Sequence, residues 1–194
     1  MPPLVSCGEP LGRPLPDNVF QLPFPVGGRV MRLNAMRQAA DSIWSPMAPL
    51  LGTWEGTGGG EPGIGKYERT YVFIFDKKFI EIRNKSVYPP SGANPKGETH
   101  EDIGYISFDK ARRKFVLRQF HIEGYVNQYV IDSLASDGKV FVFVSEAIEN
   151  IPKGWHAKES YQIVADNKIV ETFELAPPDK PFEVYTRVTL KKVK

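Results

Sequence analysis

Residues 98–122 read ETHEDIGYISFDKARRKFVLRQFHI, and this stretch decides the fold. Apolar and polar side chains alternate along 98–108 and again along 114–122, with a polar, charged segment between them. A period of two is typical of β-strands, and the polar segment is short enough to be a turn. The stretch therefore predicts an antiparallel hairpin in which Phe108 lies opposite Phe115.

The same period continues on both sides of this hairpin. The segments that carry it are rich in Val, Ile, Phe, Tyr and Thr; they are 52–58, 66–76, 78–87, 98–108, 114–122, 125–133, 139–148, 155–165, 168–175 and 181–191. Most of the connections are tight turns, whereas a parallel sheet needs crossover helices. We therefore predict an all-β fold, a closed antiparallel up-and-down barrel of about ten strands, because closure removes exposed edges. A barrel of this size has room for one small ligand.

The chain before the barrel has a different character. Prolines and glycines recur along the first 32 residues, which cannot sustain a helix or a central strand there. Helical spacing of apolar residues over 33–44 predicts a short helix, and a second short turn is expected over 47–51. We expect 1–46 to be a Pro-rich arm with a short helix, and 47–194 to be the barrel domain.

Composition narrows the function classes. The 194 residues carry a net charge of +2, with 41% hydrophobic and 25% charged residues, which indicates an ordinary globular chain without a nucleic-acid partner. Cys7 is the only cysteine, so neither an internal disulfide nor a Cys-based metal cluster can form. No apolar run is long enough for a transmembrane helix, and we expect a cytoplasmic protein without a membrane partner. The sequence leaves the oligomeric state open, a homodimer included.

The inner face of the predicted hairpin is apolar near its turn and polar farther along. The register places Asp102 opposite His121 and His100 opposite Glu123, at cross-strand contact distance. Such histidine–carboxylate pairs serve proton transfer, metal ligation or haem ligation. The alternative interpretation is that they are solvent-exposed contacts between strands, and a shift of one residue would turn the whole set to the other face.

We predict that the barrel binds a small, partly polar organic ligand, because several polar groups interrupt otherwise apolar strands. The expected contacts are Arg118, Gln119, His121, Asn127, Glu146 and Tyr161. Arg118 and His121 cannot both face inward on a regular strand, because they are three positions apart and an odd offset places side chains on opposite faces.

The alternative is a cofactor-independent isomerase, cyclase or hydratase. In that hypothesis His121 is the general base, Asp102 orients it, and Arg118 or Tyr161 stabilises an oxyanion. No metal site is expected, because the chain has three histidines and none forms an H-x-H or H-x-x-x-H pair.

The segment LLGTWEGTG at 50–58 resembles the opening of the nitrobindin-like family, intracellular ten-stranded barrels similar in shape to fatty-acid-binding proteins and lipocalins. The family pattern G-x-W-x-G-x-G is matched by Gly52, Trp54, Gly56 and Gly58. The segment HEDIGY at 100–105 is similar to the family's H-x-x-x-G-Y/F. The resemblance covers roughly 47–191 and implies that Trp54 closes one end of the barrel, so we add it to the residues around the ligand.

The resemblance also implies haem, which nitrobindins hold through a histidine near the C-terminal end of the barrel. Residues 176–194 contain no histidine, so that route is excluded here. Haem bound through His121, His100 or Tyr185 is left as the third hypothesis, and no cofactor is otherwise expected.

Overall fold

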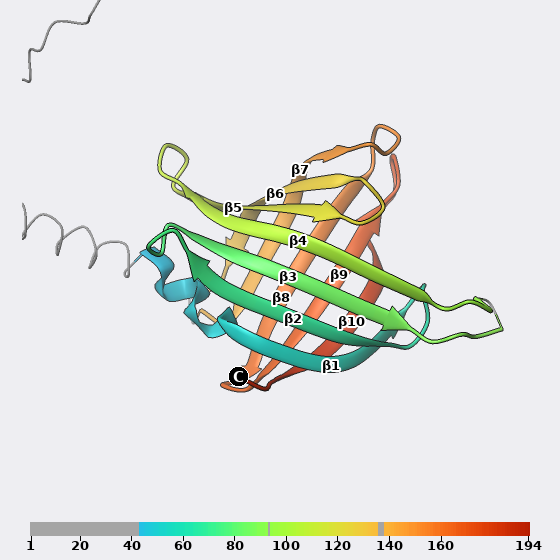
Figure 1. Cartoon of the computed structure of the whole chain (residues 1–194). Helices are drawn as coiled ribbons and strands as arrows, with labels where there is room; N and C mark the ends of the chain where they lie inside the picture. Colours follow the sequence, from blue (N-terminus) through green and yellow to red (C-terminus); the bar gives the residue numbers. More distant parts are fainter. Residues whose placement is uncertain (1–42, 93, 136–137) are drawn as a thin grey trace, which may run out of the picture. The chain divides into compact units, whose positions relative to one another are not determined.

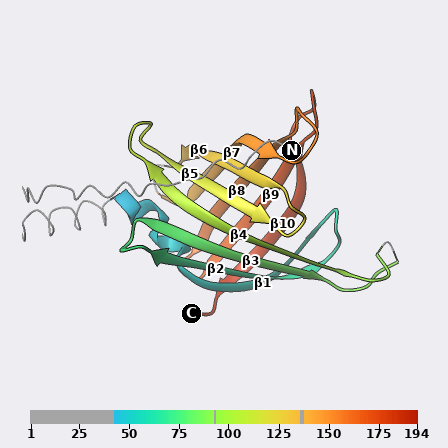
Figure 2. The same ribbon diagram turned by 45° about the horizontal axis from the view of Figure 1, so that its top comes forward.

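The computed structural model describes residues 43–92, 94–135 and 138–194. A short 3-10 helix, η1 (Ser45–Leu50), precedes ten strands. The strands are β1 (Gly52–Gly60), β2 (Gly65–Ile74), β3 (Phe79–Tyr88), β4 (Glu98–Asp109), β5 (Lys114–His121), β6 (Val126–Leu134), β7 (Val140–Glu149), β8 (His156–Ala165), β9 (Lys168–Ala176) and β10 (Glu183–Lys192). Each pairs antiparallel with its sequence neighbours, and β10 returns to β1 (Figures 1 and 2).

The predicted all-β, closed up-and-down barrel is thus confirmed. The strand bounds differ from the expected ones by a few residues at the ends, where β1 extends to Gly60 along β10. The expected turn over 47–51 is η1. The predicted Pro-rich arm and nearly all of the predicted helix over 33–44 lie outside the described residues. No helix in the described ranges is both long and apolar enough to span a membrane.

The seam between β1 and β10 explains the glycines of the first strand. Gly56 lies opposite Leu190, and a Cβ on Gly56 would collide with the carbonyl oxygen of Thr189. Gly58 faces the carbonyl of Arg187 in the same way. A side chain at either position would push the two backbones apart, so glycine allows the barrel to close here.

The helix η1 closes one end of the barrel. Its Met47 and Leu50 are fully buried, and the indole Nε1 of Trp54 donates a hydrogen bond of 2.7 Å to the carbonyl oxygen of Leu50. Trp44, just before η1, packs against Phe73 and Phe115 at ring distances of 5.8 and 5.3 Å. Trp54 thus has a buried structural position next to η1.

Side chains that point into the barrel change character along its axis. Toward η1 they are large and mostly apolar: Tyr71, Ile80, Ile82, Ile106, Phe115 and Leu117. Toward the other end the same strands place polar groups inside: Arg69, Asn84, Ser86, Asp102, Gln119 and His121. The register that the sequence predicted for the β4–β5 hairpin is confirmed, with Phe108 opposite Phe115 and Asp102 opposite His121.

Candidate functional site

A cavity of about 300 Å³ occupies the half of the barrel away from η1. Its wall holds the carboxyl groups of Glu98, Asp102, Glu123, Glu159 and Glu171. Arg69, His100 and His121 also line it, together with several tyrosines. The cavity is therefore rich in hydrogen-bond acceptors.

Arg69 on β2 and Glu171 on β9 form an ion pair across the interior. Their closest contact, Nη2 to Oε1, is 2.8 Å, and both side chains are 7% exposed. The Nε of Arg69 lies 3.1 Å from Oε2 of the same carboxylate, and its Nη1 donates to Ser86 Oγ. Paired in this way, the two charges form a fixed part of the wall.

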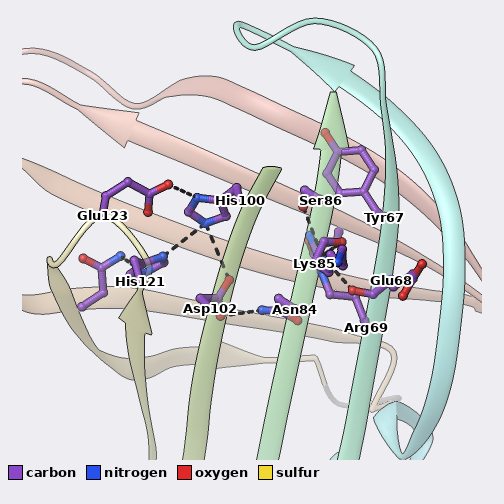
Figure 3. Close-up of polar contacts among 12 residues, drawn as sticks. Tyr67, Glu68, Arg69, Asn84, Lys85, Ser86, His100, Asp102, His121 and Glu123 are labelled. Atoms are coloured by element: carbon purple, nitrogen blue, oxygen red, sulfur yellow. Dashed lines mark hydrogen bonds and ion pairs between the residues drawn. The ribbon is translucent and has the colours of Figure 1, made fainter. Parts of the chain in front are cut away.

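His100 is the centre of a second polar group (Figure 3). Its Nδ1 lies 2.7 Å from Glu123 Oε1, while its Nε2 lies 3.3 Å from His121 Nδ1 and 3.8 Å from Asp102 Oδ2. Asp102 accepts a 2.8 Å hydrogen bond from Asn84 Nδ2. The expected contact between His100 and Glu123 is formed, whereas Asp102 contacts Asn84 and His100 rather than orienting His121.

The imidazole of His121 is held neutral by its surroundings. Its ring stacks on Tyr125 at 4.2 Å, and Asn127 Nδ2 lies 3.2 Å from its Nε2. Burial, and then the neighbouring His100, lower the pKa of His121 to about 3. A base this weak is poorly matched to proton abstraction near neutral pH, so the geometry does not favour the general-base hypothesis.

Two carboxyl groups of the wall have raised pKa values. Burial raises the pKa of Asp102 to about 6, against the opposing effects of Arg69, His100 and the Asn84 hydrogen bond. Burial and the charge of Glu171 raise the pKa of Glu159 well above its ordinary value. A raised pKa lets Glu159 keep its proton to higher pH, and the protonated carboxyl group can donate as well as accept a hydrogen bond.

Of the residues expected around the ligand, Gln119 and His121 line the cavity. Asn127 contacts the far side of His121 and lines a neighbouring pocket. Trp54 and Tyr161 are buried but are not part of the cavity wall. Trp54 packs beside η1, and Tyr161 contacts Tyr71 and Phe143 edge to face.

Arg118 and Glu146 point to the outer face, which corrects the expectation that they line the cavity. Arg118 is exposed and donates to Gln128 Oε1 at 2.9 Å, and Glu146 pairs with Arg112. Strand alternation is the reason: Gln119 and Leu117 face inward, so Arg118 between them must face outward.

The ligand contacts chosen from the sequence left out several polar groups of the wall that interrupt apolar strands: Arg69, Asn84, Glu159 and Glu171. Each is in phase with buried apolar neighbours, as Arg69 is with Tyr67 and Tyr71. This alternation was the signal that could have identified them, because a strand position that faces inward does so whatever side chain it carries.

A second, mainly apolar pocket of about 330 Å³ adjoins the cavity. Tyr125, Phe173 and Tyr185 line both spaces. The rest of the second pocket is largely apolar, with Ile148, Ile151, Pro152, Trp155, Ala157 and Leu175. Polar and apolar surfaces are therefore available side by side.

The comparisons with known proteins agree with this architecture. The crystal structure of Rv2717c from M. tuberculosis superimposes with a TM-score of 0.59 at 17% identity, covering 78% of this chain and 98% of that one, which shows a shared fold. A de novo designed fluorescence-activating β-barrel matches at 13% identity over 73% of this chain and 92% of that one, and its TM-score of 0.38 is too low to establish a shared fold. No curated protein sequence matches significantly.

Residues 44–192 match the family described as the THAP4-like, heme-binding beta-barrel domain. This match spans most of the chain and agrees with the closed ten-stranded barrel. The resemblance to nitrobindin-like barrels is thereby confirmed, and the chain belongs to the THAP4-like heme-binding β-barrel family.

Proposed function

We propose that the barrel binds a small, partly polar organic molecule in the cavity opposite η1. The observation that carries this proposal is an acceptor in the wall without a partner. Asn84 is 8% exposed and lines the cavity, and its Oδ1 has no hydrogen-bond partner within the described part of the chain. A buried amide oxygen left in this way costs free energy, and a ligand with an N–H or O–H group would satisfy it.

The two adjoining spaces suggest how such a ligand would lie. Its donor groups would face the carboxylates and Asn84, and its apolar part would extend past Tyr125 and Tyr185 toward Trp155. Binding sites of this kind combine apolar wall area with a few polar groups that fix the orientation. Gln119, whose side chain is buried in the wall, supplies a further polar contact.

Haem, which the family description names, does not fit the side chains present. An axial His or Tyr must direct its donor atom into open space. The ring nitrogens of His100 and His121 are directed at Glu123, Asn127 and each other. Burial, and then Glu98, raise the pKa of Tyr185, which disfavours the tyrosinate that would bind haem iron. We therefore propose no haem for this chain. A cytoplasmic location stays a prediction from the sequence, which leaves the oligomeric state open.

The experiment is a search for retained small molecules. The full-length protein is purified, dialysed and denatured, and the released compounds are identified by mass spectrometry. A compound found in this way is then titrated calorimetrically against wild type, Gln119→Leu and Gln128→Leu. Gln128 lies opposite Arg118 and forms its hydrogen bonds on the outer face, so it receives the same substitution as a control.

We expect Gln119→Leu to weaken binding about tenfold, since one lost buried hydrogen bond costs about 1.4 kcal/mol. Gln128→Leu should bind as wild type does. Equal affinities of all three proteins, or no retained compound and no stabilisation by any member of a metabolite library, would reject the proposal.

A further inference from the structure

We propose that His100, His121 and Asp102 form a binding site for a divalent first-row transition-metal ion on the cavity wall. His100 and Asp102 are two residues apart on β4 and share its inner face, and His121 lies directly opposite Asp102 on β5. The strand pairing alone thus brings two imidazoles and a carboxylate together. The sequence spacing concealed this, because one of the two histidines comes from the neighbouring strand.

The donor atoms converge on one point. His100 Nε2 lies 3.3 Å from His121 Nδ1 and 3.8 Å from Asp102 Oδ2, and one ligand atom from each of the three residues lies within 4.8 Å of the others. Two ligands of one tetrahedral zinc ion are about 3.3 Å apart, given bond lengths of about 2.0 Å. A small shift of Asp102 would complete the set. A porphyrin could not enter between these atoms, whereas a single ion could.

Each proposed ligand is supported from behind. Glu123 contacts the remote nitrogen of His100, and Asn84 donates to the other oxygen of Asp102. A carboxylate behind a histidine and a hydrogen bond behind a carboxylate are the arrangements that fix metal ligands in position. The contact with Glu123 also places the proton of a neutral His100 on Nδ1, which leaves Nε2 as a free lone pair directed at the other two donors.

His121 can adopt the required tautomer. Binding a metal through Nδ1 moves its proton to Nε2, where Asn127 now presents its amide nitrogen at 3.2 Å. If the Asn127 amide rotated, its oxygen would replace its nitrogen beside Nε2 of His121. The Tyr129 hydroxyl, which accepts a hydrogen bond from Asn127 Nδ2 at 2.8 Å, would then lie next to that oxygen. That oxygen is buried and has no hydrogen-bond partner within the described residues. The amide can therefore serve either form of His121.

The ligand set and its surroundings indicate the class of ion. Two imidazoles and one carboxylate suit Zn²⁺, Fe²⁺, Co²⁺ or Ni²⁺ more than Mg²⁺ or Ca²⁺. Glu98 and Glu123, at the same cavity, add negative charge that favours a cation. Three protein ligands leave at least one coordination position open toward the cavity, as in sites that exchange a water or a substrate. This site does not depend on the organic ligand, so either proposal can fail alone.

The test uses tag-free, full-length protein carrying Cys7→Ser, which removes the only thiol. Co²⁺ is added and its visible d–d absorption is followed, and Zn²⁺ is then titrated to displace it and to give a Kd. The variants are His100→Ala, His121→Ala and Asp102→Asn, with the exposed His156→Ala as the matched control. Circular dichroism verifies that each variant is folded.

We expect one ion per chain, with a distorted tetrahedral Co²⁺ spectrum in the parent and in His156→Ala. The three site variants should lose the spectrum and weaken Zn²⁺ binding by more than the roughly 10- to 100-fold caused by loss of a supporting partner. Glu123→Gln, which removes only such a partner, should fall within that range. No Co²⁺ spectrum in the folded parent, or unchanged Zn²⁺ affinity in folded His121→Ala and Asp102→Asn, would overturn the proposal.

Discussion

The strands β2 to β5 each contribute to both halves of the barrel interior, but the two halves hold different side chains. Near η1 the inward positions are filled by residues such as Ile82 and Leu117, which pack without space for a ligand. One inward position farther along these strands, Asn84 and Gln119 line a cavity of about 300 Å³. The pairing of β2 to β5 continues through both halves without a shift in register. The comparison shows that apolar packing is concentrated near η1, whereas the polar half encloses the cavity.

The largest expected effect is at the apolar end. Trp54→Ala should lower the free energy of unfolding by about 3 to 5 kcal/mol, because it removes a fully buried indole and its hydrogen bond to Leu50. Urea denaturation followed by circular dichroism measures this. Ile64→Ala, at a residue 78% exposed, should change stability by no more than about 0.5 kcal/mol. Similar losses for both variants would mean that the end next to η1 is not the stabilising half.

The polar half contains one interaction whose loss should lower the free energy of unfolding by a comparable amount. Arg69→Met should cost about 3 kcal/mol, because Glu171 would remain buried without its counter-charge. The double variant Arg69→Met/Glu171→Leu should recover most of this loss in the same denaturation experiment. Lys85→Met breaks an exposed pair with Glu101 and should give no resolvable change. A double variant as unstable as the single one would contradict the role of the pair.

A smaller effect concerns pH. The pKa of Glu159 is raised in the folded state by burial, Glu171 and Asp102, with Arg69 opposing, whereas the unfolded chain titrates near 4.5. The folded state therefore holds its proton longer, and stability falls as pH rises above about 4.5 toward the folded pKa. Glu159→Gln should flatten this decline, by at most about 1.4 kcal/mol per pH unit, the value for one proton.

Thermal or urea denaturation between pH 4 and pH 9 measures that dependence. Glu183→Gln, at an exposed position of β10, is the control and should follow the wild-type profile. If Glu159→Gln were as pH-sensitive as wild type, the carboxyl group would have to be ionised in the folded state.

The smallest effect is expected on the outer face of the same strands. Arg118→Ala should change stability by no more than about 0.5 kcal/mol and leave ligand and metal binding unaltered, because the exposed guanidinium contacts Gln128 and Ser107 outside the cavity. Denaturation and the calorimetric titrations described above test this. A clear loss of binding in Arg118→Ala would mean that ligands approach β5 from outside.

The sequence by itself determined the topology and much of the register. Alternating residues over 98–122 placed Asp102 opposite His121 and His100 beside Glu123, as the structure has them. These relations depend on local periodicity and short turns, which act between neighbours in the chain. The glycines of the first strand could also be recognised as part of a family pattern. Their physical reason, close contact with the β10 backbone, could not be predicted from the sequence.

Only the tertiary structure decided which polar groups meet inside. Arg69 and Glu171 are 102 residues apart and pair because the closed barrel brings β2 and β9, with β1 and β10 between them, around one cavity. It also decided that Asp102 bonds to Asn84, and that Arg118 faces outward while Gln119 faces inward. The physical reason is that the sequence of each strand determines which side chains lie on the same face. The curvature and closure of the sheet determine which face is enclosed and which side chains from different strands meet there.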